Sequence, residues 1–161
     1  MSGRNQEMCK GFMTMAILVL ALYQPLPAKT NGIHFLGMDL WVDSGNEALA
    51  AYQVEITYDR SAVKIVGLEG GQAGAYTNAP YYDQKGFESG RIIVAAFTIS
   101  RDAPKGRTRV ATVHIAAEGN ATPDLTCKLM TAAKTGGRRI SPGVELLPAS
   151  QEKRTDEKEK K

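Results

Sequence analysis

Strict alternation of apolar and polar residues opens the stretch 50–66, AAYQVEITYDRSAVKIV. On an extended chain, one side of this stretch carries four apolar residues, Tyr52, Val54, Ile56 and Tyr58. A period of two is typical of a strand that has one buried face and one solvated face. The polar residues 59–62 then interrupt the pattern, and a second strand is expected from Val63. The stretch therefore predicts an all-β scaffold.

Short apolar runs continue along the chain and are separated by Gly, Pro, Asp and Asn, whereas no amphipathic helix pattern stands out. Frequent turn residues between many short strands predict a two-sheet antiparallel β-sandwich of the jelly-roll type. Residues 91–99, which are apolar on both faces, predict a central strand, and Thr135, Gly136 and Gly137 predict a hairpin turn. The expected strands are 38–42, 52–58, 63–68, 91–99, 109–117, 125–132 and 140–147.

Three segments with different compositions divide the 161 residues. Arg4 and Lys10 precede an apolar run of eleven residues, 12–22, which is too short for the roughly 20 residues of a membrane span. We interpret residues 1–28 as a secretory signal helix, residues 29–149 as the folded domain, and 150–161 as a charged, disordered tail. The expected location is the periplasm, the cell surface or the extracellular space, with no stable membrane span after cleavage.

The charge balance argues against nucleic-acid binding. The whole chain carries a formal net charge of +3, and residues 29–149 hold 13 basic and 12 acidic residues. No cluster of Lys and Arg with interleaved aromatic residues occurs in this range. Because a nucleic-acid interface needs a concentrated basic patch, we exclude this class of partner.

Cys127 is the single cysteine that remains once a signal carrying Cys9 is removed, so no internal disulfide is expected. It shares a strand face with Leu125 and Leu129, which predicts a buried and inert thiol. No neighbouring base in the sequence would activate it as a nucleophile.

The connection 69–90 is unusually long for a compact β-domain and is rich in aromatic residues. We expect it to pack, with its rings closing one end of the sandwich. Tyrosine rings also suit protein interfaces and sugar faces, so this loop is the best functional candidate, together with a tryptophan on the outward face of the strand 38–42. The candidate binding residues are Trp41, Tyr76, Tyr81, Tyr82, Asp83 and Phe87.

Asp43, Ser44 and Gly45 follow an apolar strand and match the catalytic triplet of aspartic proteases. Such an enzyme needs two aspartates that share a proton, which here requires a symmetric dimer. A β-turn explains the same residues, because Asp, Ser and Gly favour turns. The dimeric protease therefore stays an alternative to the favoured non-enzymatic interpretation.

No metal motif of defined spacing occurs. His34 and His114 are the two histidines and do not form a zinc site without further ligands. Several loop carboxylates offer oxygen ligands of the kind that calcium prefers, although they lack the spacing of an EF-hand. No cofactor is expected, with calcium as the open possibility, and its candidate ligands are Asp83, Glu88, Asp102 and Asp124.

The chain resembles cohesin domains at LWVD (40–43), AYQVEITYD (51–59) and VKIV (63–66). Residues 90–95 and 108–113 are similar to later cohesin strands, and residues 132–140 are similar to the last hairpin, so the resemblance covers 33–147. Exported bacterial proteins of this type carry a segment similar to Pro-Tyr-Tyr-Asp at 80–83. The resemblance implies a nine-stranded jelly-roll sandwich related to carbohydrate-binding modules of families 2 and 3.

This resemblance implies a non-enzymatic module that recognises an envelope or extracellular protein. Cohesins bind dockerin helices on a sheet face, whereas the carbohydrate modules bind polysaccharide through planar aromatic strips. The carbohydrate alternative would use Trp41 or the pair Tyr81 and Tyr82. The chain is short at the first cohesin strand and lacks a row of aromatic residues at strand spacing, so neither ligand is carried over residue by residue.

Overall fold

The computed structural model describes residues 32–119 and 123–149. The expected signal helix and the charged tail lie outside these residues. The described part is built of strands and two short 3-10 helices, η2 (Gly74–Tyr76) and η3 (Gln84–Glu88). The strands are β1 (Ile33–Asp43), β2 (Leu49–Tyr58), β3 (Val63–Gly70), β4 (Tyr81–Tyr82), β5 (Arg91–Phe97), β6 (Arg107–Glu118), β7 (Leu125–Lys134), β8 (Arg139–Ile140) and β9 (Gly143–Pro148).

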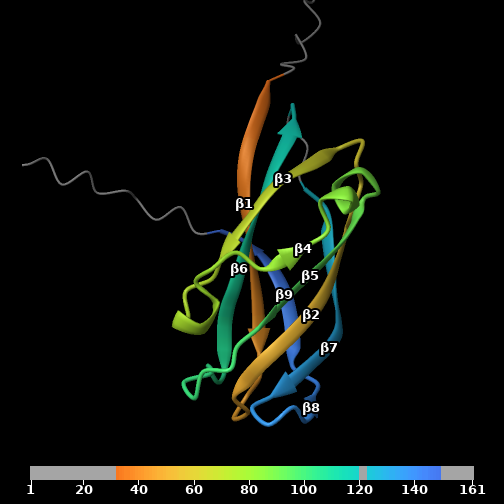
Figure 1. The fold of residues 1–161 in the computed structure, drawn as a ribbon. Coiled ribbons are helices and arrows are strands. Elements are labelled where there is room, and N and C mark those ends of the chain that lie inside the picture. The colour runs from red at the N-terminus through yellow and green to blue at the C-terminus, as the bar shows by residue number, and fades with distance from the viewer. Residues whose placement is uncertain (1–31, 120–122, 150–161) are drawn as a thin grey trace, which may run out of the picture. The chain divides into compact units, whose positions relative to one another are not determined.

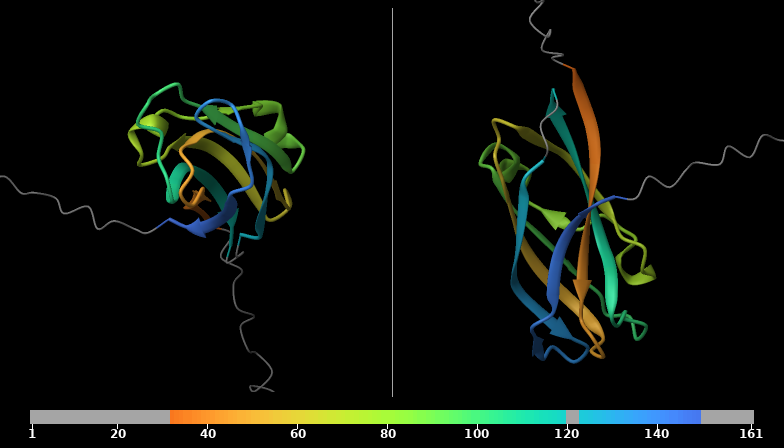
Figure 2. Two further views of the ribbon diagram at one scale, coloured as in Figure 1. Left: turned by 90° about the horizontal axis from the view of Figure 1, so that it is seen from below. Right: turned by 180° about the vertical axis from the view of Figure 1, so that it is seen from behind.

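Two antiparallel sheets face each other, as the view along the layers shows (Figure 2). The four-stranded sheet has the order β3-β6-β1-β9, and the five-stranded sheet has the order β4-β5-β2-β7-β8 (Figure 1). The predicted two-sheet sandwich is confirmed. The predicted hairpin joins β7 to β8, where Gly136 and Gly137 adopt positive φ angles of 88° and 79°, a conformation that favours glycine.

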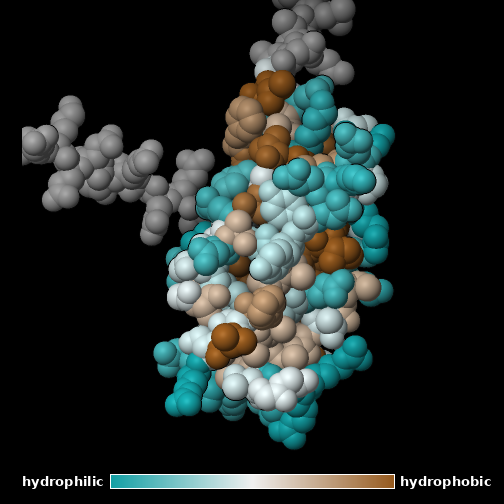
Figure 3. All heavy atoms as spheres, viewed as in Figure 1, coloured by the Kyte–Doolittle hydropathy of each residue, from teal (hydrophilic) through white to brown (hydrophobic). Residues whose placement is uncertain are grey.

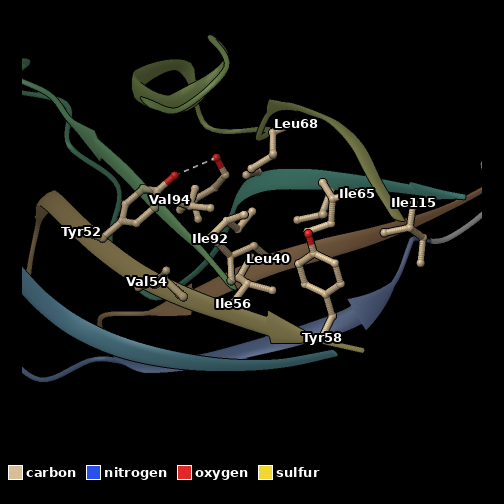
Figure 4. Packing of buried hydrophobic residues seen from close by; sticks show 14 of the residues in the cluster. Leu40, Tyr52, Val54, Ile56, Tyr58, Ile65, Leu68, Ile92, Val94 and Ile115 are labelled. Carbon is tan, nitrogen blue, oxygen red and sulfur yellow. Dashed lines mark hydrogen bonds between the residues drawn. The ribbon is translucent and has the colours of Figure 1, made fainter. Parts of the chain in front are cut away.

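The residues that alternate in the sequence of β2 separate into a buried face and a more exposed face. From Tyr52 to Tyr58 the even-numbered residues of β2 are buried, and Leu40 from β1 meets them from the opposite sheet (Figure 4). Apolar burial at about 25 cal/mol per Å² is the main term that offsets the ordering of the chain. Side chains with less than 2% exposure include Leu40, Leu49, Ile56, Ile92, Ile115, Val42, Val54, Val94, Val110 and Val113.

Several strand ends differ from the sequence prediction, and the expected strand 140–147 is two strands, β8 and β9. Two of the shifted ends leave apolar residues exposed. β1 begins at Ile33, five residues before the expected start, and pairs with β6 along its whole length but with β9 only from Met38 onward. Consequently Phe35 is 72% exposed, and hydrophobic residues gather where β1 begins (Figure 3). β5 ends at Phe97, so Ile99 lies outside the strand and is 95% exposed. An apolar run in the sequence does not show how far its neighbouring strand extends, and so it does not show which of its residues stay exposed.

The long connection after β3 is packed, as expected. Gly71 lies against the backbone of Arg109, so closely that a Cβ atom would collide with the carbonyl group. Tyr76 donates a hydrogen bond to the carbonyl oxygen of Leu49 at 2.8 Å. At the other end of the connection, the Phe87 carbonyl accepts a hydrogen bond of 2.7 Å from the hydroxyl of a β2 tyrosine, Tyr58. These contacts fix the connection onto the sandwich.

We expect alkaline destabilisation from the buried phenols. Burial raises the pKa of Tyr76 from 10.0 to about 12, and burial also raises the pKa of Tyr52 and of Tyr58. Because the folded protein holds these protons more tightly than the unfolded chain, this contribution is complete below pH 10 and is lost as pH rises through about 12.

Urea unfolding at pH 8, 10 and 11.5 measures this loss. The variant Tyr76→Phe should flatten the decrease above pH 10, although it loses the bond to Leu49 at every pH. An identical pH dependence of the free energy of unfolding in the variant and the parent protein would contradict the assignment.

Candidate functional site

The two tyrosines of strand β4 point to opposite faces of the five-stranded sheet. Tyr82 turns inward and stacks on Phe87, with ring centroids 5.4 Å apart and an interplanar angle of 18°. Tyr81 turns outward, is 70% exposed, and stacks on Phe97 at 6.3 Å and 8°. Phe97 is itself 65% exposed. The outer face therefore presents a pair of parallel rings.

These two rings border a floor of small side chains, which we call the alanine groove. In one row across the strands, Phe97 lies opposite Ala51 and Ala51 lies opposite Ala133. In the next row, Tyr81 lies opposite Ala95. The hollow has a volume of about 250 Å³, and weakly hydrophobic residues gather on the lower part of this face (Figure 3). Its lining includes Ala51, Gln53, Tyr81, Ala95, Phe97, Thr131 and Ala133.

Polar side chains on the rest of this face largely pair within the sheet, and the apolar Ile93 on β5 lies among them, opposite Glu55. Arg91 on β5 forms an ion pair with Glu55 on β2, and Nε of Arg91 donates to the carboxylate at 2.6 Å. The hydroxyls of Thr57 and Thr126 are 2.6 Å apart. The alanine groove differs from this polar region because it is a hollow lined mainly by alanines and aromatic rings.

The outer face of the four-stranded sheet contrasts with the alanine groove. Trp41 lies there, but the guanidinium of Arg107 covers its ring at 4.1 Å from the centroid. Arg107 is in turn held by Glu145 at 2.7 Å. A sugar ring that stacked on Trp41 would have to displace this cation, so the structure places Trp41 in a closed cation–π contact rather than on an open platform.

A buried polar network fills the centre of this second face. Asp39 is 7% exposed, and it accepts hydrogen bonds from Thr112 at 2.6 Å and from Arg109 at 3.2 Å. His114 lies 3.2 Å from Glu69 on the neighbouring strand. The charged groups around Trp41, Asp39 and His114 thus pair with one another, whereas the exposed apolar residues of this face lie elsewhere on it, at Ile33 and Phe35.

The other candidate binding residues from the sequence serve packing or capping in the fold. Tyr76 is 2% exposed and its ring contacts Tyr52 edge-on at 5.4 Å, so it belongs to the core rather than to a surface. Asp83 caps η3 and accepts a hydrogen bond from the amide of Lys85 at 2.9 Å. Tyr82 and Phe87 pack against the core. These placements agree with rings that close one end of the sandwich, and Tyr81 alone of the six candidates lines the alanine groove.

Sequence reasoning missed Phe97 and the three alanines that complete the groove. Phe97 lies within the run 91–99, which is apolar on both faces and therefore predicts a central strand without an exposed ring. The available sign was the alternation itself, because Ala51, Ala95 and Phe97 occupy outward positions on their strands. Small residues at outward positions carry no signal until strand pairing brings them together.

No catalytic or metal arrangement is seen in the described ranges 32–119 and 123–149. The Asp43 carboxylate accepts the amide of Gly45 at 3.0 Å, which is the turn geometry expected for these residues. No three His, Cys, Asp or Glu residues of these ranges lie close enough to hold a metal ion, so the four acids considered for calcium do not form a cluster. Cys127 is half-buried, and burial raises the pKa of its thiol.

Within the described part of the chain, no helix has the length and apolar character needed to cross a membrane.

Solved cohesin structures share this fold. The chain is similar to one in the CaDoc0917–CaCohA2 complex, with 16% identity, a TM-score of 0.53, and coverage of 69% of this chain and 87% of that one. It is also similar to a chain of the Coh-OlpA–Doc918 type I cohesin–dockerin complex from Clostridium thermocellum, with 13% identity and a TM-score of 0.51. This match covers 73% of this chain and 89% of that one. The chain is also similar to the seventh ScaB type I cohesin of Pseudobacteroides cellulosolvens, with 12% identity and a TM-score of 0.50. This match covers 73% of this chain and 83% of that one.

No protein-family model and no curated protein matches the chain. The structural matches nonetheless agree with the resemblance carried by residues 40–66, so the fold is a cohesin-like β-sandwich.

Proposed function

We propose that this protein is a non-enzymatic binding module that captures a helical segment of a protein partner in the alanine groove. The observation that carries this proposal is the exposed stack of Tyr81 and Phe97 beside a floor of alanines. Aromatic anchors next to apolar surface are typical of the centre of a protein interface. We also propose, from the sequence of residues 1–28, that the module is exported and meets its partner outside the cytoplasm.

The position of the groove favours a helix over an extended peptide. It lies on the face of the sheet, where the backbone groups of Ala51 and its neighbours on β2 are used in pairing with β5 and β7. An extended peptide laid across this apolar face would bury its own amides and carbonyls without partners, which is costly. A helix satisfies these groups internally and can present a stripe of side chains to the alanines.

The width of the groove fits the same conclusion. Phe97 on β5 and Arg139 on β8 lie at the two ends of the row through Ala51 and Ala133. Three strand spacings of about 4.8 Å separate these ends by about 14 Å. A helix with side chains is about 10–12 Å across, so one helix can lie along the sheet over β2 and β7 within this row. The cohesin–dockerin complex among the structural neighbours supports protein recognition by this fold.

A selection from a displayed library of helical peptides tests this function. The protein should enrich helices with an apolar stripe, and Ala51→Arg should reduce the binding of the selected peptides by at least tenfold, because the new side chain fills the groove. Ala116→Arg is the matched control, since Ala116 lies on the outer face of the four-stranded sheet. Equal losses in both variants, or no enrichment by the parent protein, would contradict the proposal.

Retention on insoluble polysaccharides examines the carbohydrate alternative. We expect no retention, because the Trp41 ring is covered by Arg107. Retention that disappears in Tyr81→Ala would favour sugar stacking and count against the helical partner.

A further inference from the structure

We propose, on the basis of the binding function above, that the alanine groove selects a helix whose apolar stripe is bordered by acidic side chains on one side. That side faces β7 and β8. Arg139 lies opposite Ala133 and closes the floor row at the β8 edge. Lys128 on β7 lies further along the same face, opposite Glu55. Both cations are exposed.

The acidic groups near these cations already have partners. Glu55 pairs with Arg91, and Glu47 accepts two bonds from Nζ of Lys134 at 2.7 and 2.8 Å. Neither Lys128 nor Arg139 forms an ion pair with another residue of the described part of the chain. This side of the groove therefore carries positive charge in excess of its own carboxylates.

The opposite wall is uncharged at the groove. It consists of the rings of Tyr81 and Phe97. The nearest acid that follows β4, Asp83, is turned toward the η3 amide of Lys85. A bound helix thus meets aromatic rings on one flank and cations on the other, and this asymmetry orients it. Carboxylates placed on the aromatic flank would lose water and gain no partner.

The size of the effect follows from exposure. Exposed ion pairs contribute about 0.2–1 kcal/mol each, which corresponds to roughly 1.4- to fivefold in affinity for each cation. Added salt should weaken this preference, because mobile ions screen exposed charges over about 8–10 Å. Contacts with the alanine floor are apolar and should not respond in the same way.

The same displayed helical library, with the positions that border the stripe varied among Glu, Gln and Lys, tests the charge preference. The parent protein should enrich Glu at one border only. Arg139→Glu and Lys128→Glu should each shift that border severalfold toward Lys while the apolar stripe stays the same. Lys64→Glu on the four-stranded sheet changes the net charge equally and should leave both borders as in the parent protein.

Each outcome has a defined meaning. An apolar stripe without any border preference, or with Glu at both borders, overturns the acidic partner and leaves the binding function standing. A shift caused equally by Lys64→Glu would show an effect of net charge and would also overturn it. Failure to enrich apolar stripes at all would instead overturn the binding function itself.

Discussion

Replacing Leu40 with Ala should lower the free energy of unfolding by about 2–5 kcal/mol, the usual cost of a leucine-sized cavity in a packed core. Leu40 is 0% exposed and packs from β1 onto the opposite sheet, where Ile56 and Val54 lie (Figure 4). Paired strands on both sides hold β1 here, so the backbone cannot move in to fill the space. Urea unfolding followed by circular dichroism measures the change.

Leu147→Ala provides the matched control. Leu147 is on β9 with 38% exposure, so the same atoms leave a site that solvent can refill. We expect a loss of less than about 1 kcal/mol, in line with the smaller effects of surface substitutions. Similar losses for both leucines would show that the central packing of the sandwich is misassigned.

Replacing Gly71 with Ala should cost about 1–3 kcal/mol, because an added methyl group would collide with rigid neighbours. The Cβ would meet the carbonyl group of Arg109 on β6, which is backbone rather than a flexible side chain. The Gly71 amide also donates to the Tyr76 carbonyl at 2.7 Å, so displacing it would disturb the packed connection that leads to β4. The unfolding midpoint in urea reports this cost.

Gly74→Ala serves as the comparison within the same connection. Its Cβ would meet nothing within 4 Å, and its φ angle is not positive. Removing the freedom of a glycine from the unfolded chain should leave stability unchanged or raise it by a few tenths of a kcal/mol. If Gly71→Ala is as mild as Gly74→Ala, the close approach of the connection to β6 is wrong.

The alternation at residues 52–58 was sufficient to predict β2, its buried face and the sandwich. Local turn chemistry was equally informative at Asp43 and at Gly136 with Gly137, because the residues that form these turns are neighbours in sequence. The aromatic connection was expected to pack, and the structure confirms this for Tyr76. These features depend on contacts that a short window of sequence contains.

The alanine groove could not be predicted from the sequence, because its residues come together only in the tertiary structure. Ala51, Ala95 and Ala133 are 44 and 38 residues apart along the chain, and no local pattern distinguishes them from other outward-facing alanines. Likewise the sequence leaves Trp41 either packed on the second face or exposed as a platform, and the contact with Arg107 from another strand decides between them. Local hydrophobicity is enough to predict which faces of the strands are buried, because the alternation lies within each short segment. Strand order and register decided which outward side chains meet, because those contacts join residues that are distant along the chain.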